Sequence, residues 1–202
     1  CATVSPLDDM TVPVALDGRR GACAVRDAQG RPKLAPASRV PALATRGIVQ
    51  NANDSYSLSL VGQQLDGYSL LLGSPKAPPG LRTLMSQRQI QEGLRDGRID
   101  SAEALGMVFD NRNYLAETTL DAVLAACAGA KGDAQVQAAC GILSAWDRRH
   151  DVDSRGTLLF HELGPRLASV PGLYAEPYDS ARPYRVRPVS TAPAVSAAIV
   201  AA

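Results

Sequence analysis

Two asparagines separated by a single residue, Asn51 and Asn53, are the side chains of this sequence best suited to stabilising an anion. An asparagine amide presents two N–H donors and carries no charge, so it can donate to an oxyanion without acting as a base. Amide hydrolysis needs such a donor, in addition to a nucleophile and a base. On an extended backbone, side chains two residues apart point the same way, which predicts that both amides face one place. The alternative is an ordinary turn, because asparagine, aspartate and serine side chains often bond to the nearby backbone.

The elements that must position these asparagines follow from the distribution of proline, glycine and apolar residues. Residues 1–80 are interrupted by prolines and glycines, which predicts a loop-rich segment with short strands, one of them at residues 48–49. Residues 81–170 carry apolar side chains at helical spacing and are predicted to be helical. Residues 171–202 contain several prolines and are predicted to form an irregular tail, with a helix beginning near residue 194.

Capping residues and apolar periodicity predict five helices between residues 81 and 170. The expected starts, in chain order, are Leu81, Asp100, Thr119, Asp133 and Thr157. Pro165 is expected to kink or end the last of them. The side chains expected to share a face within a helix are Leu84, Gln87, Gln91 and Leu94, then Leu105, Val108 and Phe109, then Leu120, Val123, Leu124 and Cys127, then Val136, Ala139, Cys140, Leu143 and Trp146, and finally Leu158, Leu159, Leu163 and Leu167.

The composition excludes two classes of function. With 21 basic and 20 acidic side chains the net charge is +1, which argues against an electrostatic nucleic-acid binder. No apolar run approaches the roughly 20 residues that cross a bilayer, so no membrane span is expected. Hydrophobic residues make up 46% of the chain, which is typical of a globular protein with a core.

The four cysteines form two sequence-local pairs, Cys1 with Cys23 and Cys127 with Cys140. Their spacings do not match C-x-x-C zinc or redox motifs. Cys127 ends one amphipathic run and Cys140 lies inside the next, so a disulfide between two helices is expected. Disulfides indicate an oxidising compartment, the periplasm or the outside of the cell. Four buried free thiols are the alternative.

The segment Val49–Tyr56, VQNANDSY, resembles the asparagine motif in the β chain of the penicillin acylase family, which includes acyl-homoserine-lactone acylases. In that family the second asparagine of the pair helps to stabilise the oxyanion, and this position is Asn53. An arginine after a proline-rich connection helps to hold that asparagine, and the arginine of PPGLR, Arg82, takes this place. The resemblance therefore implies Asn53 and Arg82 as candidate catalytic residues. The alternative for Arg82 is a solvent-exposed side chain in the first turn of a helix.

The rest of the motif and a second segment extend the resemblance. Asn51, Asp54 and Ser55 would support the loop that carries the oxyanion asparagine. Residues 138–160 are similar to the family's A-C-x-x-L-x-x-W-D-x-x-x-x-x-D-S-x-x-G region, with matches at Trp146, Asp147, Asp153 and Ser154. These matches imply a structural role, with the tryptophan in the core and the aspartates capping turns or pairing with arginines. The two cysteine pairs also fit those of the acyl-homoserine-lactone acylase branch.

The resemblance implies a fold that is mainly α with short strands and long loops, as a fragment of an αββα N-terminal nucleophile hydrolase β chain. The nucleophile of the family is an N-terminal serine whose own α-amine acts as the base. No such serine begins this chain, so the isolated chain is predicted to be inactive. Its expected partners are the remainder of the β chain, the α chain of the same processed precursor, and a small acyl amide as substrate.

Several alternatives stay open at this point. Cys1 could be the nucleophile of a cysteine-led hydrolase, although a disulfide to Cys23 is the preferred interpretation. Some members of the family bind calcium, but the spacing of Asp66, the nearest candidate, does not match, so no cofactor is assigned. His150 and His161 are interpreted as surface residues rather than metal ligands. The competing function is a disulfide-stapled helical structural or binding module without catalysis.

Overall fold

The computed structural model describes residues 42–60, 76–130 and 132–202, together with residues 29, 31, 40 and 65. The chain divides into two compact units, of which the first comprises Cys1–Val49 and Ser55–Ala77 and the second Gln50–Asp54 and Pro78–Ala202. The predicted pairing of Cys1 with Cys23 lies outside the described residues. The same holds for the calcium candidate Asp66.

In the described part of the first unit, a short 3-10 helix spans Tyr56–Leu58 and is followed by an antiparallel bridge between Val49 and Leu60. The side chains of Leu58 and Leu60 are buried. A strand was expected at residues 48–49, but the described residues there form only this single bridge. Between Val49 and Leu60 the pairing does not continue, because residues 52–54 bend and Tyr56–Leu58 form the 3-10 helix.

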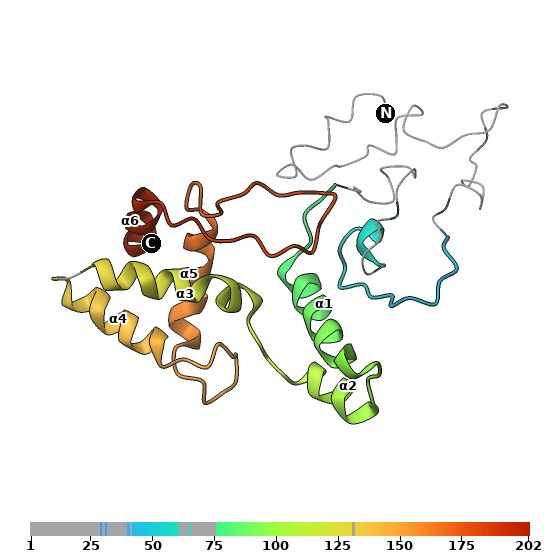
Figure 1. Ribbon diagram of the computed structural model, residues 1–202, viewed down its shortest axis with the longest axis horizontal. Coiled ribbons are helices and arrows are strands. Elements are labelled where there is room, and N and C mark those ends of the chain that lie inside the picture. The colour runs from blue at the N-terminus through green and yellow to red at the C-terminus, as the bar shows by residue number, and fades with distance from the viewer. Residues whose placement is uncertain are drawn as a thin grey trace. The chain divides into compact units, whose positions relative to one another are not determined.

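The second unit is a group of helices with α3 at its centre (Figure 1). Its elements are α1 (Leu81–Gly93), η5 (Leu94–Asp96), α2 (Ser101–Val108), α3 (Tyr114–Gly129), α4 (Ala134–Ser144), α5 (Thr157–Ala168) and α6 (Pro193–Ala201). Helix α3 contacts α1, α4, α5 and α6. The expectation of a mainly helical chain is confirmed, and across the described residues extended backbone pairs only at isolated bridges.

Helices α1 and α2 begin where the sequence predicts. Helix α1 passes into η5, and Gly97 ends the pair in the left-handed conformation with φ of 92°. The Asp100 side chain caps α2, and the Glu103 side chain returns to the Asp100 backbone N–H to complete a capping box. The side chains predicted to share a face on α1 and α2 are mostly not buried. On α1 only Gln87 of the expected set is buried, and the apolar stripe of α2 is exposed, with Val108 at 71%.

Helix α3 begins five residues before the predicted cap. Its N-cap is Asn113, whose side-chain oxygen accepts the N–H of Ala116 at 2.9 Å. Thr119, the expected cap, lies inside the helix, where its hydroxyl donates to the carbonyl of Leu115 at 2.6 Å. The prediction was wrong because a threonine can satisfy its hydroxyl within a helix as well as at its start. The predicted apolar face of α3 is confirmed, since Leu120, Val123 and Cys127 are buried.

The main core lies where α3, α4, α5 and α6 meet. Phe160 and Trp146 pack with their ring centroids 5.0 Å apart, and the indole N–H of Trp146 donates to the carbonyl of Arg149 at 3.0 Å. Gly156 lies against this indole with φ of 113°, and a Cβ there would come within 2.7 Å of the Cβ of Trp146. Only glycine meets both conditions without strain. Helix α5 continues through Pro165 to Ala168, so the proline does not end it early.

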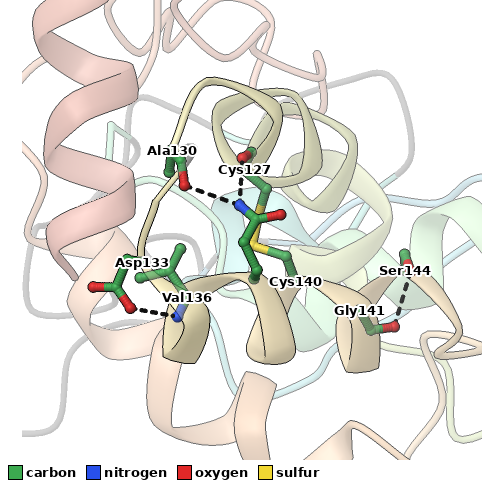
Figure 2. The surroundings of a disulfide bond; sticks show 8 residues. Cys127, Ala130, Asp133, Val136, Cys140, Gly141 and Ser144 are labelled. Atoms are coloured by element: carbon green, nitrogen blue, oxygen red, sulfur yellow. Dashed lines mark hydrogen bonds between the residues drawn. A yellow bond between two sulfur atoms is a disulfide. The ribbon is translucent and has the colours of Figure 1, made fainter.

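The predicted disulfide between Cys127 and Cys140 is present and joins α3 to α4, with the two Cα atoms 6.1 Å apart (Figure 2). Asp133 caps α4 by accepting the N–H groups of Gln135 and Val136. The Gln137 side chain donates to the carbonyls of Cys127 and Ala130 at 3.1 Å and 3.0 Å, so it bonds to the carbonyls at the end of α3. The turn between α3 and α4 is therefore held covalently and by hydrogen bonds.

The segment from residue 171 to residue 192 is irregular, as predicted, apart from a bridge between Tyr174 and Val189. Helix α6 follows at the position expected from the sequence and buries Val195 and Ile199 in the main core. Among the described helices, none combines the length and the apolar character that crossing a bilayer requires.

Candidate active site

The loop that carries the two asparagines is bent rather than extended. Asn53 adopts the left-handed conformation with φ of 69°. Its backbone N–H donates to the side-chain oxygen of Asn51 at 2.8 Å, which is the local side-chain-to-backbone bond typical of an asparagine turn. The expectation that both amides point the same way is therefore wrong. Asn51 folds back onto its own loop, and this leaves Asn53 as the donor available for chemistry.

Arg82 reaches this loop from the first turn of α1. One of its terminal nitrogens, Nη2, donates to the carbonyl of Ala52 at 2.8 Å and to the side-chain oxygen of Asn53 at 3.1 Å. The structure thus brings together the two predicted site residues, which are 29 positions apart in the sequence. Arg82 is also solvent-exposed. It therefore both contacts Asn53 and lies exposed in the first turn of a helix, which were the two alternatives for this residue.

The contact with Arg82 determines which way the Asn53 amide faces. A guanidinium group only donates hydrogen bonds, so the amide oxygen must be the atom that faces it. The Nδ2 donor of Asn53 then points to the opposite side of the amide group. Within the described part of the chain nothing accepts a hydrogen bond from this nitrogen, and the side chain is exposed. The arrangement offers an oriented, uncharged donor to an acceptor that comes from outside the described residues.

Asn53 and Arg82 are among the residues that line an open groove with a volume of about 690 Å³. The side chains of Met85 and Gln89 continue the groove along α1, and Met107 of α2 adds a second thioether. The groove is therefore partly apolar beside the oriented amide.

The other polar residues of the motif have separate positions. The carboxylate of Asp54 accepts the backbone N–H of Gly80 at 2.7 Å, at the start of α1. The hydroxyl of Ser55 lies 3.1 Å from that of Ser57. Asp54 and Gly80 are 26 residues apart, and the sequence alone does not reveal that they meet.

Helix α1, which carries Arg82, is held against α3 by a network of ion pairs. Arg112 is 2.5 Å from Glu117 and 2.6 Å from Glu92, and Arg88 is 2.6 Å from Glu117. The hydrogen bond from Arg112 lowers the pKa of Glu92 below its usual value. Burial alone would raise the pKa of Glu117, but hydrogen bonds from Arg112 and Arg88 outweigh burial and lower it. Both glutamates therefore remain charged and keep α1 in place at neutral pH.

We expect Arg112→Met to lower the free energy of unfolding strongly at pH 7 and much less in acid. The folded-state pKa values of Glu92 and Glu117 lie below the ordinary 4.5. Their stabilisation is therefore fully present above pH 4.5 and is lost as the pH falls through the folded-state values. Urea unfolding of the full-length protein at pH 7 and in acid measures this, with the exposed Arg155→Met as control. Equal losses at both pH values for Arg112→Met would contradict the prediction.

The remaining predicted residues have structural positions. His150 and His161 are both exposed, as expected, and His150 contacts the Asn113 side chain at 2.6 Å. No cluster suited to holding a metal ion occurs in the described residues. Asp147 caps the turn after Trp146, where it accepts from the backbone N–H of Arg149 and from the hydroxyl of Ser154. Trp146 is in the core, which confirms the interpretation of this residue.

Comparison with known proteins identifies relatives over most of the chain. The family model for penicillin amidase matches residues 6–191. The acyl-homoserine lactone acylase PvdQ of Pseudomonas putida is 36% identical over 173 residues, covering 84% of this chain and 22% of the relative. Aculeacin-A acylase of Actinoplanes utahensis is 36% identical over 177 residues, covering 80% of this chain and 22% of the relative. The chain thus spans about a fifth of the length of these relatives.

Proposed function

Because this chain belongs to the penicillin amidase family, we propose that the enzyme of which it forms a part hydrolyses the amide bond of an N-acylated small molecule. An acyl-homoserine lactone is a substrate of this class, and so is a β-lactam whose side chain is attached through an amide. Two relatives at 36% identity, each named as an acylase, support the proposal. The rest of the catalytic apparatus lies outside residues 1–202. In particular, the nucleophile is the N-terminal serine of the processed β chain, with its own α-amine as base.

The contribution of this chain is the oxyanion donor. When the serine oxygen adds to the substrate carbonyl, negative charge develops on the carbonyl oxygen, and Nδ2 of Asn53 donates a hydrogen bond to it. Arg82 holds the opposite end of the same amide, at 3.1 Å from Oδ1, and so keeps the donor facing the substrate. This hydrogen bond is the observation that carries the proposal. A donor that is oriented before reaction stabilises the transition state more than one that must reorganise.

The partners of the chain in this proposal are the remainder of the β chain and the α chain of the same processed precursor. They supply the αββα layers of an N-terminal nucleophile hydrolase fold. The disulfide between Cys127 and Cys140 supports a location in the periplasm or outside the cell, where such a bond persists.

Removing the arginine tests the proposal directly. We expect Arg82→Met in the full-length enzyme to lower kcat about 10- to 100-fold, since a hydrogen bond from a charged donor contributes roughly 1.5–3 kcal/mol. KM should change little, because the amide is needed most when charge develops. The matched control is Arg88→Met on the same helix, which breaks the ion pair with Glu117. It should lower the melting temperature while leaving kcat unchanged.

The opposite outcome favours a different function. If Arg82→Met and Arg88→Met have the same effect on kcat after correction for folding, Arg82 is only a surface arginine. If substitution of Asn53 is also silent, a disulfide-stapled helical module without catalysis is the better description of this chain.

A further inference from the structure

We propose that Asp54 is a positioning residue for the Asn53 amide, because it fixes the asparagine loop to the backbone at the start of α1. This inference rests on the proposed function and adds a residue to it. Asp54 touches neither the amide of Asn53 nor the groove beside it. Asp54 follows Asn53 directly in the sequence, and it acts by attaching the loop to Gly80 at that point.

The attachment is a short hydrogen bond to a group that would otherwise need a partner. Oδ2 of Asp54 accepts the N–H of Gly80 at 2.7 Å, and Gly80 is the N-cap of α1. A glycine has no side chain with which to cap the helix, and Thr83 stands where a capping box would place glutamate or glutamine. Helix α2 meets the same need internally, since Glu103 accepts the N–H of its own N-cap at 2.8 Å. In α1 a residue from a distant loop takes this role.

The carboxylate of Asp54 approaches Gly80 closely. A Cβ at this position would lie 3.2 Å and 3.3 Å from the two carboxylate oxygens of Asp54. Such contacts are tighter than a carboxylate and a carbon atom normally accept. The glycine therefore lets the carboxylate reach the backbone, and the positive end of the helix dipole favours its negative charge there.

The same helix turn holds the asparagine loop at two points. Gly80 binds Asp54 through the backbone, and Arg82 binds Ala52 and Asn53 through a long side chain. Arg82 orients the amide of Asn53, but the stem of this exposed side chain has many rotamers, so Arg82 does not by itself fix the loop relative to α1. The backbone contact of Asp54 is short and rigid. Together the two contacts determine where Nδ2 of Asn53 points relative to α1.

Kinetic comparison of two Asp54 variants in the full-length enzyme tests the inference. We expect Asp54→Ala to lower kcat about 10- to 100-fold, because a displacement of about 1 Å at a catalytic group can cost that much. Asp54→Asn keeps an oxygen that accepts the Gly80 N–H, so its kcat should stay within about 3-fold of the wild type. KM should change less than kcat in both variants, and melting temperatures identify any loss that comes from unfolding.

A matched pair at Gly80 removes the donor from the other side. Gly80 has φ of −68°, which proline accepts, so Gly80→Pro removes the N–H without changing the backbone angle. Gly80→Ala keeps the N–H and adds the same Cβ. We expect Gly80→Pro to lower kcat about as much as Asp54→Ala, and clearly more than Gly80→Ala. In the Asp54→Ala background, Gly80→Pro should lower kcat little further, because both substitutions remove the same hydrogen bond, from the Gly80 N–H to Asp54.

The outcomes separate this inference from the proposed function. If Asn53→Ala lowers kcat about 100- to 1,000-fold but Asp54→Ala keeps kcat within about 3-fold of the wild type, Asp54 has no positioning role. If Gly80→Pro and Gly80→Ala both keep kcat within about 3-fold of the wild type, the inference is overturned too, even if Asp54→Ala fails to fold. If Asn53→Ala is itself silent, the proposed function fails, and the positioning role fails with it.

Discussion

We expect Asn53→Ala in the full-length enzyme to lower kcat about 100- to 1,000-fold, which corresponds to roughly 3–4 kcal/mol of lost transition-state stabilisation. The reason is that Nδ2 of Asn53 is an uncharged donor, held in one orientation by the bond between Arg82 and Oδ1. Binding of the uncharged substrate depends less on this donor, so KM should change by a much smaller factor. Steady-state hydrolysis of a chromogenic fatty-acyl anilide measures both constants.

Two further variants separate the lost donor from a disturbed backbone. Asn53 has φ of 69°, which strains alanine but not glycine, so Asn53→Gly should lose as much kcat with less loss of stability. Asn111 is a matched control, because it is also left-handed, with φ of 50°. Asn111 also lines the groove, but its amide already donates to Asp151 at 2.7 Å, so Asn111→Ala should reduce stability and lower kcat far less than Asn53→Gly. Equal falls in kcat for Asn53→Gly and Asn111→Ala would show that Asn53 has no special chemical role.

The second large effect concerns the disulfide. Replacing both Cys127 and Cys140 with serine should lower the free energy of unfolding by about 3 kcal/mol. This is the stabilisation expected when a disulfide closes a loop of about 15 residues in the unfolded chain. The sequence separation is 13, and Cys127 is buried in the core that α3 to α6 share. Urea unfolding of the full-length enzyme, followed by tryptophan fluorescence, is the measurement.

A reductant supplies the control for the disulfide variant. Dithiothreitol should cost the wild-type protein about 3 kcal/mol more than it costs the double variant, because the double variant keeps only the predicted bond between Cys1 and Cys23 for the reductant to open. A loss below about 1 kcal/mol for the double variant would show that the hydrogen bonds of Gln137 to the end of α3 suffice to hold the turn.

Features determined by neighbouring residues were predictable from the sequence. The start of α2 depends on Asp100, which caps the helix as expected, and on Glu103 three positions later, which completes a capping box. The disulfide was also predicted, because its two cysteines lie in consecutive helices. The start of α3 was missed, although Asn113 precedes the helix and Glu117 lies in its first turn. An asparagine cap was the available signal, and the apolar pattern beginning at Leu120 concealed it.

Features that depend on distant contacts were not predictable from the residues alone. Whether the stripe of Leu105, Val108 and Phe109 on α2 is buried depends on what packs against it, and periodicity contains no such information. The bend at Asn53 depends on Asn51 accepting its N–H rather than the loop remaining extended. The pairing of Asn53 with Arg82 was implied only by the family resemblance. Nothing in the sequence indicated the meeting of Asp54 with Gly80.

The exposed stripe on α2 has a practical consequence. The side chains of Leu105, Val108 and Phe109 are 59%, 71% and 69% accessible to water. A recombinant protein covering residues 78–202 would therefore present an exposed hydrophobic ridge on α2, a helix that its capping box stabilises. Self-association at this ridge, rather than unfolding, is then the first obstacle to purifying that protein. Lysine or glutamate at positions 105 and 108 is the natural remedy, because these residues lie inside α2 and outside its N-cap and C-cap.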